Sequence, residues 1–143
     1  MKKEKEVSEC TGFEALYLAA LDSDVSLITG VPGYPITSLM ELFLRKHGEK
    51  EPVEASKDKP RVSSSSASEI PRDYSAMWLT NEKVALEMAL GASVSGRRAL
   101  VLVKHVGMNL LSDPLITSTT HTIGAGLVII AGDDPGVKGS QNE

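Results

Sequence analysis

Two continuous apolar runs constrain the fold of this chain more than any other feature of its sequence. Residues 99–103 read Ala-Leu-Val-Leu-Val, and residues 127–131 read Leu-Val-Ile-Ile-Ala. Each run has the length of a β-strand and does not alternate apolar with polar side chains, so each strand is expected to be buried on both faces. The sequence therefore predicts an α/β fold of three layers, α/β/α, with a mostly parallel central sheet.

Weaker patterns place the remaining elements, which are expected in the order helix, strand, helix, long loop, strand, helix, strand, helix, strand. The expected ranges are 11–21, 26–29, 38–46, 48–72, 74–79, 82–95, 99–103, 107–121 and 127–131. In the first helix Leu16, Ala19 and Ala20 are expected to face the core. Pro114 is expected to kink the 107–121 helix or to start its second part.

Residues 48–72 are rich in charge, proline and serine and poor in apolar side chains. Such a segment buries too little apolar surface to offset the entropy of ordering it. The block before it is too small to fold alone, so we interpret the segment as a flexible loop within one domain that spans residues 1–143.

Composition excludes several classes of protein. The 143-residue chain carries 15 basic and 19 acidic side chains, and this net charge of −4 argues against a general nucleic-acid binder. Its single cysteine, Cys10, excludes an intrachain disulfide and a cysteine-held metal cluster. No apolar run approaches the ~18 residues that span a bilayer. A cytoplasmic protein without a membrane partner is expected.

Residues 30–37, which read Gly-Val-Pro-Gly-Tyr-Pro-Ile-Thr, lie where a strand is expected to end and a helix to begin. This edge of an open α/β sheet is where ligands bind. A simple turn with Thr37 or Ser38 as a helix cap explains the segment equally well. The segment is not a phosphate-binding P-loop, because the Gly-Lys-Ser/Thr ending is missing.

Three further segments follow expected strands. Asn81 and Glu82 open a helix, either as a cap with a favourably placed carboxylate or as a functional carboxylate at the sheet edge. Residues 104–109 contain Lys104, which could be solvated, and His105, which could be a structural hydrogen-bonding group or a functional acid, base or donor. Residues 132–136 are explained well enough by a turn. All of these segments are expected to line one edge of the sheet.

Together these segments resemble the pyrimidine-binding domain of thiamine-diphosphate enzymes. Within that superfamily the closest likeness is to the large (alpha) subunit of indolepyruvate ferredoxin oxidoreductase. The resemblance runs from about residue 11 to the end, except for residues 48–72. Its most specific parts are the runs Asn-Glu-Lys-Val-Ala-Leu-Glu and Lys-His-Val-Gly-Met-Asn, in that order. The residues that carry it are 30–33, 35, 81–87, 104–109, 113–115, 133–136 and 140–143.

The resemblance implies that thiamine diphosphate is the cofactor and that Glu82 is catalytic. In such enzymes one glutamate accepts a hydrogen bond from N1′ of the aminopyrimidine and so favours the tautomer that can remove a proton from the cofactor. The resemblance also implies that Gly30, Pro32 and Gly33 shape a wall of the site near the pyrimidine or the substrate. It implies that His105 and Asn109 face the same cavity or a subunit contact. The implied cofactor-binding residues are Gly30, Pro32, Gly33, Glu82, His105 and Asn109.

The family carries its diphosphate and magnesium in a second domain with a Gly-Asp-Gly motif, which has no match in this sequence. The resemblance therefore implies that a partner holds magnesium and that this chain supplies no metal ligand. The chain is expected to be a truncated or split subunit, or a stand-alone relative. Its implied partners are a second copy or a diphosphate-binding chain, with ferredoxin served indirectly. A split 2-oxoacid decarboxylase and a non-catalytic relative are the alternatives.

Overall fold

The computed structural model describes residues 10–48, 73–121 and 124–136 of the chain. The long loop expected over residues 48–72 lies almost wholly outside the described residues and stays a prediction, as does the assignment of the whole chain to one domain.

The elements follow one another in the expected order, and their bounds differ from the expected ones by at most a few residues. Pro114 lies inside α4, which runs through it as one continuous helix. The elements are α1 (Gly12–Asp22), β1 (Val25–Gly30), α2 (Thr37–Gly48), β2 (Ser75–Trp78), α3 (Glu82–Val94), β3 (Arg98–Lys104), a 3₁₀ turn (His105–Gly107), α4 (Met108–Ser118) and β4 (Leu127–Gly132).

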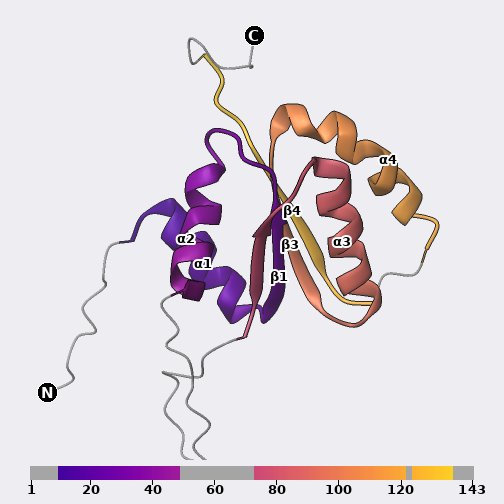
Figure 1. Cartoon of the computed structure of the whole chain (residues 1–143), viewed down its shortest axis with the longest axis horizontal. Helices are drawn as coiled ribbons and strands as arrows, with labels where there is room; N and C mark the ends of the chain where they lie inside the picture. Colours follow the sequence, from indigo (N-terminus) through magenta and orange to yellow (C-terminus); the bar gives the residue numbers. More distant parts are fainter. Residues whose placement is uncertain (1–9, 49–72, 122–123, 137–143) are drawn as a thin grey trace, which may run out of the picture.

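The sheet of the described residues has the strand order β2-β1-β3-β4, and every neighbouring pair is parallel. Helices α1 and α2 cover one face of the sheet, and α3 and α4 cover the other (Figure 1). The predicted three-layer α/β/α fold with a parallel central sheet is therefore confirmed. None of the helices in the described ranges is long and apolar enough to cross a membrane.

The two faces of the sheet are packed by different kinds of side chain. Against α2, large residues such as Phe43 and Met40 fill the core, and the hydroxyl of buried Tyr74 donates to the carbonyl of Phe43 at 2.8 Å. Against α3, small residues such as Ala85 and Ala89 bring the helix close to the sheet. The hydroxyl of buried Thr29 donates to the carbonyl of Ala85 at 2.9 Å and ties the start of α3 to β1.

The expected inward stripe of α1 is wrong in two of its three positions. Ala20 is buried, but Leu16 is 40% exposed and Ala19 is also exposed. The helix instead packs through Tyr17 and Phe13, which lie one and two turns before Ala20 on the same face. Such a stripe shift changes which side chains are buried without changing the helical periodicity that predicted the helix.

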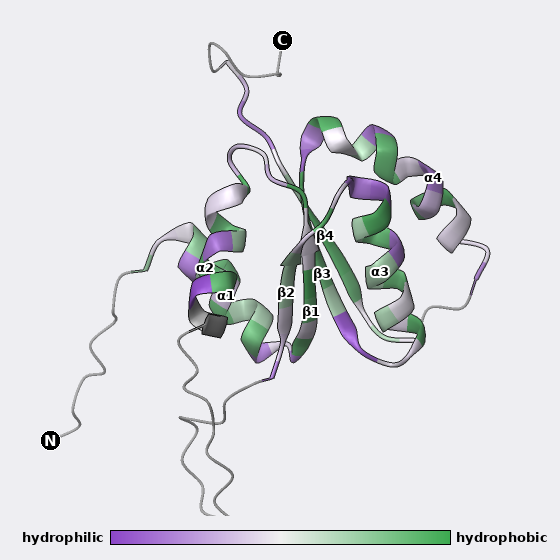
Figure 2. Ribbon diagram, in the orientation of Figure 1, coloured by the Kyte–Doolittle hydropathy of each residue, from purple (hydrophilic) through white to green (hydrophobic). Residues whose placement is uncertain are grey.

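The expectation that β4 is buried on both faces is also wrong. Among the described strands β4 lies at the edge of the sheet, and Val128 is 57% exposed there. Val128 and Ile130 line an apolar groove of about 170 Å³ together with Leu16 and Ala19 of α1. The green of β4 in Figure 2 marks its residues as apolar, and within the described part of the chain Val128 among them is exposed.

Candidate functional site

The four segments that follow the strands lie at one edge of the sheet. All four strands are parallel, so their carboxyl ends point the same way and the segments at 31–36, 79–81, 105–107 and 133–136 come together there. The expected convergence of these segments is confirmed. In open α/β sheets this edge is the usual place for a ligand.

Glu82 is the first residue of α3, and the local sequence fixes where that helix begins. The side chain of Asn81 accepts a hydrogen bond from the backbone N–H of Val84 at 3.0 Å, which satisfies one of the free donors of the first turn. The expected cap is therefore confirmed. It does not compete with a functional role for Glu82, because the cap and the carboxylate are different residues.

The side chain of Glu82 is partly buried and lies directly against the backbone of Gly107. A Cβ placed on Gly107 would be 2.5 Å from Oε1 of Glu82 and 2.6 Å from its Cγ. Within the described ranges, no side chain or backbone group makes a hydrogen bond or ion pair with the Glu82 carboxylate. The carboxylate is therefore held in place by packing while its oxygens stay available as acceptors.

The N-termini of two helices lie near the Glu82 carboxylate. The residue stands in the first turn of α3, and Gly107 directly precedes α4, so the positive ends of two helix dipoles meet near its carboxylate. The two helices are also joined by an ion pair between Lys83 and Asp113. The hydrogen bond with Asp113 raises the pKa of Lys83 above its ordinary value.

Lys104 and Asp134 form a buried ion pair at this edge. The Nζ of Lys104 lies 3.2 Å from Oδ1 of Asp134, and the two side chains are only 11% and 3% exposed. Lys104 is therefore not solvated. A turn at residues 132–136 does not by itself explain that segment, because Asp134 also pairs with Lys104. The strand register could have indicated the pair, since Lys104 lies opposite Gly132, two residues before Asp134.

Gly33 and Gly132 let the loop at residues 31–36 pack closely against the ends of the strands. A Cβ on Gly33 would be 3.1 Å from Cβ of Lys104, and one on Gly132 would be 3.1 Å from Cδ of Pro35. A Cβ on Gly30 would be 2.6 Å from the carbonyl oxygen of Leu102, so packing within the sheet by itself requires a glycine there. The loop is closed by Thr37, whose hydroxyl accepts a hydrogen bond from Gly33 N–H at 2.9 Å.

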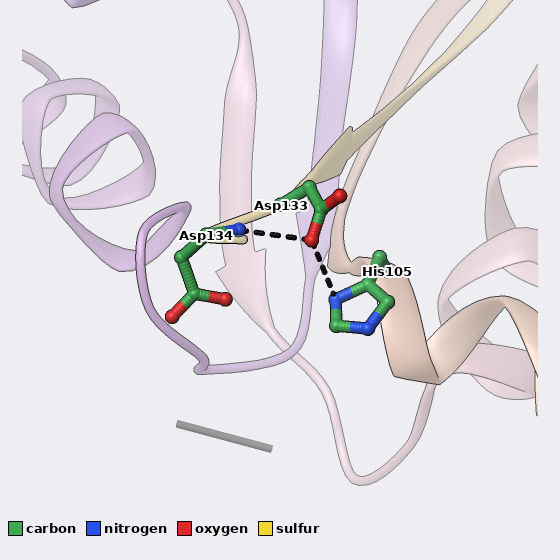
Figure 3. A group of neighbouring side chains, drawn as sticks. All are labelled: His105, Asp133 and Asp134. Carbon is green, nitrogen blue, oxygen red and sulfur yellow. Dashed lines mark hydrogen bonds and ion pairs between the residues drawn. The ribbon is translucent and has the colours of Figure 1, made fainter. Parts of the chain in front are cut away.

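His105 faces Asp133 across the ends of β3 and β4 (Figure 3). Its buried Nδ1 lies 3.4 Å from Oδ1 of Asp133, without a hydrogen bond to any described residue, and the same oxygen accepts from the backbone N–H of Asp134 at 2.9 Å. Ligand atoms of His105, Asp133 and Asp134 lie within 4.8 Å of one another. Because the carboxylate of Asp134 already binds Lys104 and that of Asp133 accepts from the Asp134 backbone, a network of polar contacts describes this trio better than a metal site.

The other expected site residues lie on the surface of the same edge. Pro32 is exposed in the loop, and Asn109 is exposed at the start of α4. Tyr34, in the same loop as Pro32, is also exposed. The structure thus packs Glu82 against Gly107 and pairs His105 with Asp133, while Pro32 and Asn109 remain open to solvent.

Comparison with known proteins agrees with the resemblance. The chain is 33% identical to the indolepyruvate oxidoreductase subunit IorA of Pyrococcus horikoshii over 135 residues, which is 92% of the chain and 17% of that protein. It is also 33% identical to IorA of Archaeoglobus fulgidus over 135 residues, 92% of the chain and 18% of that protein. The chain is a homologue of IorA. The likeness to indolepyruvate oxidoreductase expected from the sequence is therefore confirmed.

A shorter stretch is more similar still. IorA of Methanothermobacter thermautotrophicus is 46% identical over 63 residues, 44% of the chain and 10% of that protein. The chain spans 17–18% of the length of the first two curated relatives described above. No family model and no solved structure matches the chain.

Proposed function

We propose that this chain is the pyrimidine-binding part of a thiamine-diphosphate-dependent 2-oxoacid oxidoreductase of the indolepyruvate type, and that Glu82 activates the cofactor. One observation carries the proposal. Glu82 stands at the ligand-binding edge of a parallel sheet, held against Gly107, with no hydrogen-bond partner in the described ranges. The IorA relatives support the choice of reaction class.

The residues present fit the aminopyrimidine of thiamine diphosphate. Thiamine diphosphate supplies the electron sink for bond cleavage beside the carbonyl of a 2-oxo acid. The proposed task of Glu82 is to accept a hydrogen bond from N1′ and to keep a negative charge beside it, so that N4′ can act as a base. A carboxylate that is partly withdrawn from water and set between two helix N-termini suits this task, because electrostatic interactions are stronger there than in bulk water.

The remaining residues of the edge are assigned supporting roles. Pro32 and Gly33 would form a wall beside the pyrimidine or the substrate, and Gly30 lets β1 and β3 come close enough to hold that wall in place. His105 and Asn109 would face the same cavity or the contact with another subunit. These assignments and the cytoplasmic location remain predictions.

The proposed site is completed by another chain. Magnesium prefers oxygen ligands from carboxylates and phosphates, and we assign magnesium and the diphosphate to a partner, in a homodimer or a hetero-oligomer that serves ferredoxin indirectly. The outer faces of α3 and α4 are the proposed contact surface. Met88, Leu110 and Ile116 are large apolar side chains exposed on these two helices.

Affinity purification of the tagged chain from its own cells tests the proposal. We expect a partner with the Gly-Asp-Gly diphosphate motif and cysteine ligands for iron–sulfur clusters to be recovered with it. A partner that has the diphosphate motif without such cysteines would favour the split decarboxylase. Recovery of the chain by itself, without thiamine diphosphate, would contradict the proposal and favour a non-catalytic relative.

A further inference from the structure

We infer that Gly107 is a positioning residue for Glu82, because the missing side chain at position 107 determines where the Glu82 carboxylate lies. The inference rests on the proposed function for its catalytic consequence, whereas its structural part concerns this chain by itself. Gly107 is the glycine of the Lys-His-Val-Gly-Met-Asn run, and the sequence by itself does not indicate this role for it.

The contact between the two residues involves most of the Glu82 side chain. A Cβ on Gly107 would lie 2.5 Å from Oε1, 2.6 Å from Cγ and 2.8 Å from Cδ of Glu82, and these are the three heavy atoms nearest to it. In real structures a Cβ atom essentially never lies within 3.0 Å of another such heavy atom, and all three distances are shorter than that. An alanine at position 107 and the observed Glu82 conformation therefore exclude each other.

Backbone geometry does not explain the glycine. Gly107 has φ −69° and ψ −15°, which is ordinary right-handed helical geometry that alanine adopts readily. Gly96, by contrast, has φ +82° and is required by its turn. The requirement at position 107 is thus for space, and Glu82 is what occupies that space.

The clash would be relieved by Glu82 and not by its helix. The first turn of α3 is fixed by the Asn81 cap, by the bond from Thr29 to the Ala85 carbonyl and by the ion pair between Lys83 and Asp113. A free side chain changes rotamer far more easily than these contacts break. Gly107→Ala is therefore expected to leave the fold in place and to turn the carboxylate away from the edge where N1′ would bind.

The structural part is tested on the chain itself, labelled with ¹³C at the carboxyl carbon of glutamate. The Glu82 resonance is assigned by its loss in Glu82→Gln. We expect Gly107→Ala to shift this resonance, while Gly12→Ala, where a Cβ meets nothing within 4 Å, leaves it unchanged. An unmoved Glu82 resonance in folded Gly107→Ala would overturn the inference.

The catalytic part is tested in the complex recovered with the partner. A misplacement of about 1 Å at a reacting group can cost about 10²-fold, so Gly107→Ala is expected to lower kcat by about 10²-fold with little change in KM. In a Glu82→Gln background the same substitution should cause no further loss, since the two residues act as a unit. Full activity of Gly107→Ala beside an inactive Glu82→Gln would refute the positioning role and leave the proposed function standing. A shifted resonance with both variants fully active would refute the proposed function instead.

A stability measurement covers the case in which Gly107→Ala does not fold. Glu82→Ala removes the Cγ, Cδ and Oε1 atoms that the new methyl group meets. The double variant Glu82→Ala/Gly107→Ala is then expected to regain a cooperative thermal transition. A double variant that stays unfolded would show that something other than Glu82 requires the glycine, against the inference.

Discussion

Replacing Glu82 with glutamine is expected to lower the turnover of the assembled enzyme by about 10²–10⁴-fold, the usual contribution of a positioned acid or base. Glutamine has the same shape as glutamate and fits the same space against Gly107. It carries no charge, however, and so loses the electrostatic stabilisation that a carboxylate provides. The initial rate of 2-oxo acid oxidation measures the effect.

The control for this prediction lies on the opposite face of the sheet. Glu41 is exposed on α2, and Glu41→Gln removes the same charge without touching the candidate site or the proposed contact surface. We expect Glu41→Gln to keep its turnover. Both variants should fold, because the Asn81 cap remains and a first-turn charge contributes only about 0.3–1 kcal/mol to helix stability. Unchanged turnover in folded Glu82→Gln would refute the role proposed for this residue.

Lys104→Met is expected to have the largest effect on stability, lowering the free energy of unfolding by about 3–5 kcal/mol. The methionine fills a similar volume but removes the cation that lies 3.2 Å from Asp134 Oδ1, and the Asp134 side chain is only 3% exposed. A charge left in such a place without that cation is strongly destabilising. Urea denaturation followed by circular dichroism measures the loss.

Two comparisons separate this effect from the general loss of a lysine. Lys83→Met breaks an ion pair whose side chains are 45% and 67% exposed, and it is expected to change stability little because water screens such pairs. Lys104→Met combined with Asp134→Leu replaces both buried charges and is expected to recover most of the stability. If Lys104→Met were as mild as Lys83→Met, the importance of the buried pair would be disproved.

The periodicity of apolar side chains was sufficient to predict the elements and the parallel sheet. It was insufficient for α1 and β4, and the reason is physical. Whether Leu16 and Val128 are buried depends on what covers the edge of the sheet, and apolar spacing within α1 or β4 carries no information about that. An edge strand and a central strand can have the same run of apolar residues.

The candidate site divides in the same way. Glu82 was predicted because a family motif surrounds it and because the end of a strand precedes it. The role of Gly107 was not predicted, since it depends on how α3 and α4 pack. The Lys104–Asp134 pair was not predicted either, since it depends on how β3 and β4 are aligned. Residue types show which groups could do chemistry, but three-dimensional packing decides which of them meet.

The most direct test of a shared site is calorimetric titration of thiamine diphosphate with magnesium into the chain, into its recovered partner, and into the two together. Binding is expected in the mixture and not in the chain by itself, because the metal and diphosphate ligands are assigned to the partner. Glu82→Gln in the mixture is expected to bind through the diphosphate end while losing turnover. Micromolar binding by the isolated chain, or a mixture that binds no better than the partner alone, would contradict the shared site.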